Sequence, residues 1–162
     1  MKIADIKPIL MPTKITQVNE KLYRGNAIFS PIKAYRLKRK GITQVIDLRH
    51  ENNIFVKLFK YLEMFYCKKL NIKYVRKDFF GKGLERVPNK DFFDNINEQI
   101  NSSDKTYIHC HYGKHRTGFA VAMYQKSIGI PDEEIINQLR NNDWSHDRGN
   151  LLNIFLQRFF NK

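Results

Sequence analysis

Strand-like and helix-like segments alternate along this chain. Residues 42–48 (ITQVIDL) and 106–110 (TYIHC) are rich in β-branched and apolar residues, a composition that suits buried strands. Between them, Asn89 can cap a helix with four apolar residues on one face: Phe92, Phe93, Ile96 and Ile100. Strands that alternate with helices predict a parallel or mixed sheet that helices cover on both faces.

Shorter signals complete the pattern. Strands are predicted at 15–18, 21–24 and 72–75, and helices at 31–40, 55–69, 118–128, from 131 and at 151–160. Ser30 and Pro31 suit the start of the first helix, and Gly41 suits its end. The 55–69 helix carries Leu58, Leu62 and Phe65 on one side. We therefore expect an α/β fold: a central, mostly parallel sheet of about four to five strands flanked by helices.

Length and composition limit the class of protein. The 162 residues suit one domain, 1–162, with residues 1–14 as a loosely ordered N-terminal arm, and the 42% hydrophobic content excludes a disordered chain. No apolar run approaches the ~20 residues that span a membrane, and Met1 to Lys14 contain no signal-peptide core. We expect a cytoplasmic monomer without a disulfide framework, since Cys67 and Cys110 are the only cysteines.

The net charge is strongly positive. Lys and Arg number 29 against 16 Asp and Glu, which gives +13 at pH 7. Such a charge favours anionic partners, although an Ile-, Asn- and Lys-rich composition accounts for part of it. A nucleic-acid binder is disfavoured, because the basic residues of the first helix are spread around it and predict a solvated face. These residues are Lys33, Arg36, Lys38, Arg39 and Lys40.

One segment carries the chemistry: residues 109–118, HCHYGKHRTG, between a predicted strand and a helix start. Backbone amides and the positive end of the helix dipole converge at such a place, and they favour a bound anion and the thiolate of Cys110. Arg116 offers paired donors for phosphate oxygens. Gly113 lets the chain curl, and Thr117 can place a hydroxyl near the sulfur. The segment therefore suits an anion held beside a nucleophilic thiolate.

The same segment resembles the H-C-x5-R-S/T signature of the cysteine-dependent protein tyrosine and dual-specificity phosphatases. Its Gly-Lys-His-Arg-Thr-Gly portion is most similar to that of the plant and fungal atypical dual-specificity phosphatases. A weaker resemblance runs from Leu22-Tyr23-Arg24 through residues 45–49 to the C-terminal helices. The resemblance implies one dual-specificity-phosphatase-like domain.

The resemblance also implies a two-step hydrolysis without metal or other cofactor. Cys110 forms a phosphocysteine that water then hydrolyses. Arg116 and the amides of residues 111–116 hold the phosphoryl oxygens, His109 orients and acidifies the cysteine, and Thr117 assists breakdown of the intermediate. The substrate-binding residues of the loop are then His111, Tyr112, Gly113, Lys114 and His115.

The family needs a carboxylic acid on another loop to protonate the leaving oxygen. Asp78 follows the 72–75 strand and precedes Cys110 by 32 positions, which matches the spacing in compact members. Asp143 and Asp147 are reserve candidates. Asp91 and Asp94 lie inside a predicted helix, and Asp104 lies at the wrong end of a strand. We interpret another acid, Asp47, as a structural residue that forms a hydrogen bond with Arg49.

Other readings stay open. His109, Cys110, His111 and His115 could form a metal cluster, although the two nearest histidines point to opposite faces of an extended chain. A rhodanese-type transferase would not need the Arg-Thr-Gly pattern. Cys67 could form a redox pair with Cys110, or lie buried beside Phe65 and Tyr66. A non-catalytic phosphate-binding pseudophosphatase is the main alternative to the enzyme.

The substrate class follows from charge. Lys114 and His115 add positive charge within the loop itself, and five residues near the proposed acid add more: Lys73, Arg76, Lys77, Lys82 and Arg86. The loop also resembles those of family members that act on inositol pyrophosphates. We therefore expect a soluble inositol polyphosphate or pyrophosphate, ahead of a phosphoprotein for which Tyr112 or Phe79 would line the pocket.

Overall fold

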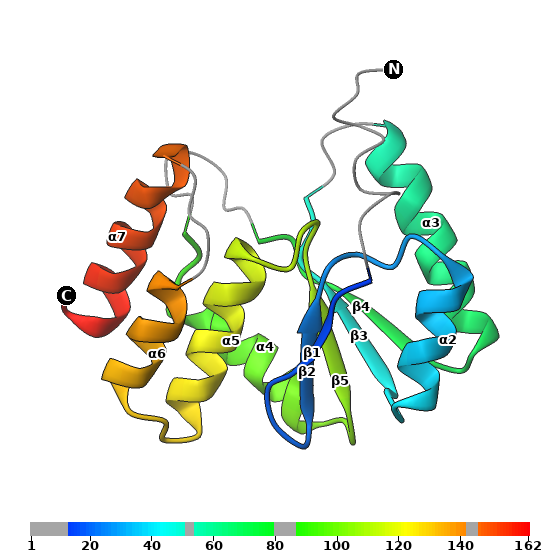
Figure 1. Cartoon of the computed structure of the whole chain (residues 1–162), viewed down its shortest axis with the longest axis horizontal. Coiled ribbons are helices and arrows are strands. Elements are labelled where there is room, and N and C mark those ends of the chain that lie inside the picture. Colours follow the sequence, from blue (N-terminus) through cyan, green and yellow to red (C-terminus); the bar gives the residue numbers. More distant parts are fainter. Residues whose placement is uncertain (1–12, 51–53, 80–86, 142–145) are drawn as a thin grey trace.

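The sheet forms the centre of the molecule (Figure 1). The computed structural model describes residues 13–50, 54–79, 87–141 and 146–162. The strand order is β1-β2-β5-β3-β4; β1 pairs antiparallel with β2, and the pairs β2–β5, β5–β3 and β3–β4 are parallel. The strands are β1 (Ile15–Gln17), β2 (Leu22–Gly25), β3 (Gln44–Asp47), β4 (Lys73–Arg76) and β5 (Thr106–His109). The expected mostly parallel sheet is confirmed.

Helices cover both faces of this sheet (Figure 1). One layer consists of α2 (Pro31–Arg39) and α3 (Ile54–Lys69). The opposite layer consists of α4 (Lys90–Asn101), α5 (His115–Ser127), α6 (Asp132–Arg140) and α7 (His146–Phe160). None of the helices in the described ranges has the length and apolar character needed to cross a membrane.

The ends of α2 form as the sequence predicts. Ser30 adopts an extended backbone, and its side-chain oxygen accepts a hydrogen bond from the Lys33 amide at 3.3 Å. Pro31 occupies the first helical position, and Gly41 takes a φ of +79° just after the helix. Farther upstream, Lys14 at the end of the predicted arm is tied to the sheet, because its amide donates to Asn26 Oδ1 at 3.1 Å.

The larger of two apolar cores lies between the sheet and α4–α7. Phe93, Ile96 and Ile100 of α4 are fully buried there, as their spacing predicts. The smaller core lies under α2 and α3 and contains Cys67. The chain thus buries most of its apolar side chains on one face of the sheet.

The apolar side of α3 faces outward. Leu58, Leu62 and Phe65 do share one side of the helix, but all three are exposed. The inner side instead buries Lys60 and Glu63. This arrangement is stable because Arg49, in the loop after β3, supplies both polar partners: its guanidinium pairs with Glu63, and its carbonyl accepts from the Lys60 ammonium group. The buried charges therefore retain hydrogen bonds away from water.

Lys33 also departs from the predicted solvated face of α2, because it is buried. Its ammonium group donates to the carbonyl and side-chain oxygens of Asn26 and, at 3.2 Å, to the carbonyl of Ala27. Burial lowers the pKa of Lys33 to about 7, although the nearby carboxylate of Glu63 acts in the opposite direction. The remaining basic residues of this group are exposed as expected: Arg36, Lys38, Arg39 and Lys40.

Candidate active site

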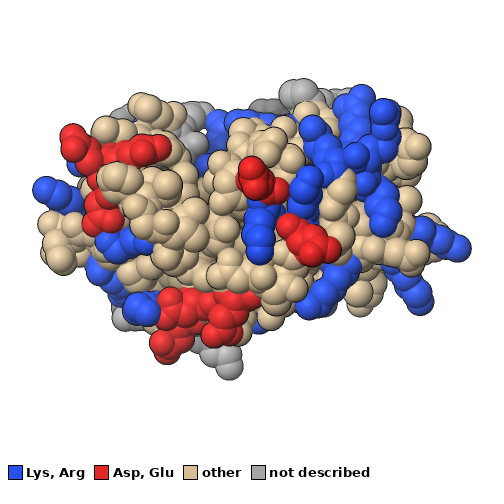
Figure 2. All heavy atoms as spheres, turned by 90° about the horizontal axis from the view of Figure 1, so that it is seen from below, with Lys and Arg blue, Asp and Glu red and all other residues tan. Residues whose placement is uncertain are grey.

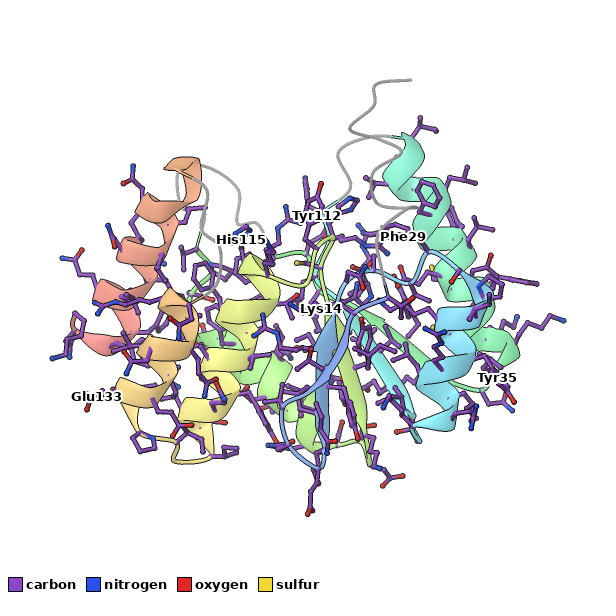
Figure 3. The ribbon with its side chains drawn as sticks, in the orientation of Figure 1. Lys14, Phe29, Tyr35, Tyr112, His115 and Glu133 are labelled. Carbon is purple, nitrogen blue, oxygen red and sulfur yellow. The ribbon has the colours of Figure 1, made fainter. Side chains whose placement is uncertain are left out.

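The loop with the phosphatase-like signature follows β5, the middle strand of the sheet. Cys110 ends the strand side of the loop and is 5% exposed, and His115 begins α5. Figure 3 shows Tyr112 and His115 at the edge of the sheet where the parallel strands end. In open α/β sheets, ligands bind at this carboxyl edge. The loop therefore lies where such a fold places its site.

Gly113 makes the curl of this loop possible. Its φ is +72°, a left-handed backbone conformation that L side chains rarely adopt. A Cβ at this position would also lie 2.2 Å from the carbonyl oxygen of Gly25 at the end of β2. The loop and β2 approach so closely that a side chain has no room.

Arg24 of β2 braces the loop from behind. Its Nη2 donates to the carbonyl of Gly113 at 2.8 Å and to that of Lys114 at 3.2 Å, while the amide of Ala27 donates to the carbonyl of His111 at 3.2 Å. In a trans peptide the carbonyl and the next N–H point in opposite directions. The amides of the residues after these three carbonyls therefore face the other side of the loop, where an anion can bind.

This bracing role was missed in the sequence analysis. Leu22-Tyr23-Arg24 carried only a weak family resemblance, and no local pattern indicates a bond to a loop 89 residues away. Burial lowers the pKa of Arg24, against the influence of the nearby Cys110. The guanidinium is thus held close to the proposed nucleophile as well as to the loop backbone.

A buried cluster of charges supports the loop from the α3 side. Arg49 donates from Nε to Asp47 Oδ1 at 2.9 Å and from Nη2 to Asp47 Oδ2 at 2.9 Å, and it also pairs with Glu63. The Tyr74 hydroxyl donates to Asp47 Oδ2 at 2.6 Å. The predicted Asp47–Arg49 pair is confirmed. Burial favours the neutral acid, but the charges of His109 and Arg49 outweigh it and hold the pKa of Asp47 well below its usual range.

His109 links this cluster to the loop. Its Nδ1 lies 3.0 Å from the carbonyl oxygen of Cys110, and its Nε2 lies 3.0 Å from Glu63 Oε1, without the alignment of a hydrogen bond. A His at this position therefore orients the backbone of Cys110 and faces a carboxylate on the other side. We find no direct bond between the ring and the thiol in the described residues.

Asp47, Glu63 and His109 each offer one candidate ligand atom, and these atoms lie within 4.8 Å of one another, close enough to hold a metal ion. Arg49 already pairs with both carboxylates and supplies the cation. The sequence also suggested a metal cluster of residues 109, 110, 111 and 115. Among the residues that the structure describes, the candidate ligand atoms of those four do not lie this close together. The donor set therefore suits an ion-pair network better than a metal.

The remaining loop side chains are half-buried or buried. His111 packs edge-on against Tyr112 at 4.7 Å and Phe29 at 5.6 Å between ring centroids. Burial, with the charges of Arg49 and Arg116, lowers the pKa of His111 to about 4, so the ring is neutral at pH 7. Lys114, His115 and Arg116 are half-buried at the start of α5.

Thr117 lies in the first turn of α5 and is fully buried. Its hydroxyl has no hydrogen-bond partner among the described residues. A buried hydroxyl without a partner is uncommon, because the loss of its hydrogen bonds to water costs free energy. The group is therefore available to a bound ligand or to the neighbouring thiol.

Asp78 lies at the same edge of the sheet. Asp47 of β3 is in register with Arg76 of β4 and with His109 of β5, so Asp78 and Cys110 both follow the last paired residues of their strands. Two strand spacings, about 10 Å, separate β4 from β5. Arg76 Nη2 contacts Asp78 Oδ2 at 3.2 Å, and the carboxylate is 39% exposed. It is accessible from the edge where the loop lies.

The two reserve candidates for the general acid come from the C-terminal part of the chain. Asp143 lies outside the described residues, and Asp147 lies in α7 at a position whose side chain is not described. Asp91 and Asp94 lie in α4 as predicted, and the Asp94 carboxylate pairs with Lys90 at 2.5 Å.

The structure changes two further expectations, those for Phe79 and Lys73, and leaves a third, for Lys82 and Arg86, untested. Phe79 does not line a pocket: it is 2% exposed and packs against Phe92, Phe93 and Phe119. Lys73 begins β4 and so lies at the opposite edge of the sheet from the loop, because parallel strands share a direction. Lys82 and Arg86 lie outside the described residues.

The proposed redox pair is not supported by the packing. Cys67 belongs to the core under α2 and α3, whereas Cys110 belongs to the core on the other face. Burial, with the charges of Glu63 and Asp47, raises the pKa of Cys67 to about 12, so its thiol is a poor nucleophile. The buried helix position beside Tyr66 is the better reading.

Comparisons with known proteins agree with this geometry. The Siw14 catalytic core superposes with a TM-score of 0.70 at 18% identity, covering 94% of this chain and 88% of that chain. The core catalytic domain of the PP-IP phosphatase SIW14 from S. cerevisiae gives 0.59 at 18% identity, with coverages of 80% and 76%. TpbA from P. aeruginosa gives 0.64 at 14% identity, with coverages of 90% and 90%. At these identities the likeness shows the fold.

A comparison with curated protein sequences finds no match. The model of the tyrosine phosphatase family matches residues 13–141, which include all five strands, the loop and α5. Because that match spans most of the sequence and contains the cysteine loop, the chain belongs to the tyrosine phosphatase family and is a cysteine-dependent phosphatase.

Proposed function

We propose that Cys110 is the nucleophile and Arg116 the main phosphate-binding side chain of this phosphatase. The observation that carries the assignment is the loop backbone: three of its carbonyls bond to β2 and the segment after it, so the amides that follow them face the anion side. Cys110 lies at the start of that loop and Arg116 at its end. The other described cysteine, Cys67, does not lie in such a loop, because it is buried on the inner side of α3.

The proposed reaction has two steps, and its bonds and protons are accounted for without a cofactor. The Cys110 sulfur attacks phosphorus; an S–P bond forms while the P–O bond to the leaving group breaks, and a carboxylic acid protonates the leaving oxygen. Water then attacks phosphorus and gives a proton to the carboxylate left by the first step; an O–P bond forms while the S–P bond breaks, which releases phosphate and restores the thiolate. The Thr117 hydroxyl, which has no described partner, supports this second step by hydrogen bonding to the departing sulfur.

Cys110→Ser should abolish turnover while phosphate binding persists, because a hydroxyl ionises poorly at neutral pH. Arg116→Lys should also be severely impaired, since an ammonium group cannot provide two parallel hydrogen bonds. The same preparations treated with EDTA should keep wild-type activity. Turnover by purified Cys110→Ser, or loss with EDTA that a divalent metal restores, would refute the assignment.

The general acid is assigned to Asp78 on its place at the sheet edge and its exposure. Asp78→Asn should slow hydrolysis most for alkyl phosphates, whose leaving oxygen needs a proton, and least for aryl phosphates. Asp94→Asn, on the exposed surface of α4, is the matched control. Wild-type rates on every leaving group would move the role to Asp143 or Asp147.

The substrate we favour is a soluble inositol polyphosphate or pyrophosphate. Lys114 and His115 lie in the loop, Arg76 ends β4 and Lys77 follows it, so several cations come from the same edge of the sheet. A monophosphate does not use all of them. The fold is also similar to that of SIW14, a PP-IP phosphatase.

Phosphotyrosine is the second candidate. Tyr112 lies in the loop at the sheet edge, where its ring could contact an aromatic substrate (Figure 3). A Cys-to-Ser form of TpbA, which shares this fold, binds pTyr. A phosphotyrosine peptide and an inositol pyrophosphate are therefore the two substrates to compare directly.

Lys114→Ala separates these candidates. It should raise KM strongly for the polyphosphate and little for an aryl phosphate, and added salt should weaken polyphosphate turnover more. Lys126→Ala, in the last turn of the same helix, is the control. Equal losses on both substrates, or preference for the phosphopeptide, would favour a phosphoprotein substrate while the cysteine chemistry stands.

A further inference from the structure

The outer surface of α2 and α3 is unusually apolar. Of the ten large hydrophobic side chains found exposed in the described parts of the chain, eight lie on these two helices. Ile54 is 73% exposed, Tyr61 68% and Ile32 65%. The eight are Ile32, Tyr35, Ile54, Leu58, Tyr61, Leu62, Met64 and Phe65. We call this set the α2–α3 apolar face.

On α3 these residues form a helical stripe. Ile54, Leu58, Tyr61 and Phe65 recur at intervals of four, three and four, which places them on one side of an α-helix. The opposite side is fixed to the protein by buried groups, including Glu63, which accepts a hydrogen bond from the Ile28 amide at 2.8 Å. The helix therefore cannot rotate its apolar stripe inward without burying lysines and breaking that cluster.

The charges on these helices have one sign. Every exposed charged residue of α2 and α3 is Lys or Arg, and their single acid, Glu63, is fully buried. Figure 2 shows Lys and Arg gathering on the side of the molecule that carries these helices. The cations lie beside the stripe: Lys69 Nζ is 5.6 Å from the centre of the Phe65 ring.

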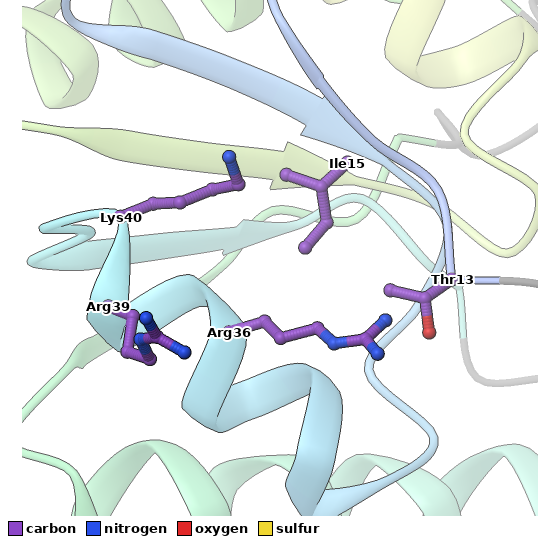
Figure 4. A pocket seen from close by; sticks show the side chains of 5 residues that line it. All are labelled: Thr13, Ile15, Arg36, Arg39 and Lys40. Carbon is purple, nitrogen blue, oxygen red and sulfur yellow. The ribbon is translucent and has the colours of Figure 1, made fainter.

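A basic pocket extends this surface around α2. Its cavity of about 410 Å³ is lined by Thr13 and Ile15 near β1 and by three cations of the helix region: Arg36, Arg39 and Lys40 (Figure 4). Among the residues that the structure describes, no acidic side chain lines this pocket. Arg36 and Arg39 pair with no acidic side chain in the described residues. The pocket suits a phosphate group.

We propose that the α2–α3 apolar face docks on the surface of an anionic membrane, with apolar side chains in the interface and the surrounding cations on lipid phosphates. Apolar and basic groups without exposed acids are the composition of helices that lie in a membrane surface. A second copy of the chain fits less well, because two such faces would bring like charges together. The inference is independent of the substrate.

The test is co-sedimentation of the full chain with vesicles of phosphatidylcholine containing phosphatidylserine, and with phosphatidylcholine alone. The protein should bind the anionic vesicles, and raised salt should weaken this binding. Leu58→Gln/Phe65→Gln should lower the partition coefficient about tenfold, since apolar burial contributes to interfacial binding. Ile154→Gln, a half-exposed apolar site on α7, is the matched control and should bind like wild type.

Turnover of a soluble aryl phosphate should be unchanged in all three proteins, which shows that the variants fold. Absence of binding to the anionic vesicles, or equal binding to both vesicle types, would overturn the proposal. So would a dimer in sedimentation equilibrium that Leu58→Gln/Phe65→Gln converts to monomer, because a second copy would then cover the face.

Discussion

The two helical layers of the molecule differ in what they bury: one buries a large apolar core, and the other buries charged groups beside a smaller apolar core. On the α4–α7 side, aromatic rings fill the core: Phe119 stacks on Phe155 with centroids 4.1 Å apart, and Phe93 meets Phe159 edge-on at 5.3 Å. On the α2–α3 side, Lys33 and Glu63 are buried beside a smaller apolar core that includes Leu37, while eight large apolar side chains of those helices are exposed.

The active-site loop connects the two layers, and each contributes something different. The helix that carries Arg116 and Thr117 is anchored in the aromatic core, since residues 117–124 of α5 are buried. His109 on the preceding strand faces the charged cluster instead. Apolar packing therefore stabilises the helix behind the site, whereas ion pairs fix the orientation of the strand end. Substitutions in the two layers should separate stability from activity.

The largest effect on stability is expected in the aromatic layer. Phe155→Ala removes a fully buried ring between Phe93 and Phe119. It should lower the free energy of unfolding by about 4 kcal/mol, measured by urea denaturation, because the lost transfer free energy and the cavity add. The kcat of the remaining folded protein should stay near wild type. A stable variant with impaired kcat would show that this layer acts on the site directly.

A smaller loss of stability with a loss of activity is expected in the charged layer. Glu63→Gln removes one of the two carboxylates that pair with Arg49 and the carboxylate that faces His109, and it should cost about 3 kcal/mol of unfolding free energy. Because His109 also bonds to the carbonyl of Cys110, kcat should fall as well. Glu134→Gln on the surface of α6 is the matched control. Retention of wild-type kcat would limit the cluster to a purely stabilising role.

The next effect depends on pH and concerns His111. Its folded pKa of about 4 lies below the ordinary 6.5, so between these values the unfolded chain binds a proton that the folded chain does not. Stability should therefore fall as pH falls from 6.5 to 4. His111→Gln should make the decrease in unfolding free energy at low pH smaller by roughly 1–2 kcal/mol, a figure that allows for partial exposure of the ring. Parallel urea titrations at pH 7 and pH 4.5 give the measurement.

The smallest effect is expected on the α2–α3 apolar face. Leu62→Gln replaces an exposed side chain and should change the unfolding free energy by less than about 0.5 kcal/mol. Leu152→Gln, at a buried position on α7, should cost several times more. Thermal denaturation of the two variants compares them, and similar losses would mean that Leu62 is covered in solution.

Much of the site follows from local sequence because its parts are consecutive. Cys110 to Thr117 form one loop and one helix turn, and strand, glycine and helix-start signals place them without distant contacts. The Asp47–Arg49 pair is also local, two residues apart. Arg24 could not be found in this way, since its bonds to the loop depend on β2 lying beside β5.

Local sequence predicts the order of strands and helices, the phosphatase-type loop and the helical period of α3. Those properties depend on neighbours within a few residues, where backbone preference and side-chain spacing act. Which side of α3 faces the sheet depends instead on contacts between distant segments. The spacing of apolar residues in α3 predicts an apolar stripe, but Glu63 on the other side pairs with Arg49 and accepts a hydrogen bond from the Ile28 amide in the interior. A buried carboxylate without such partners would be too costly. Those partners come from separate segments, so only the assembled fold shows that the charged side is inside and the apolar side outside.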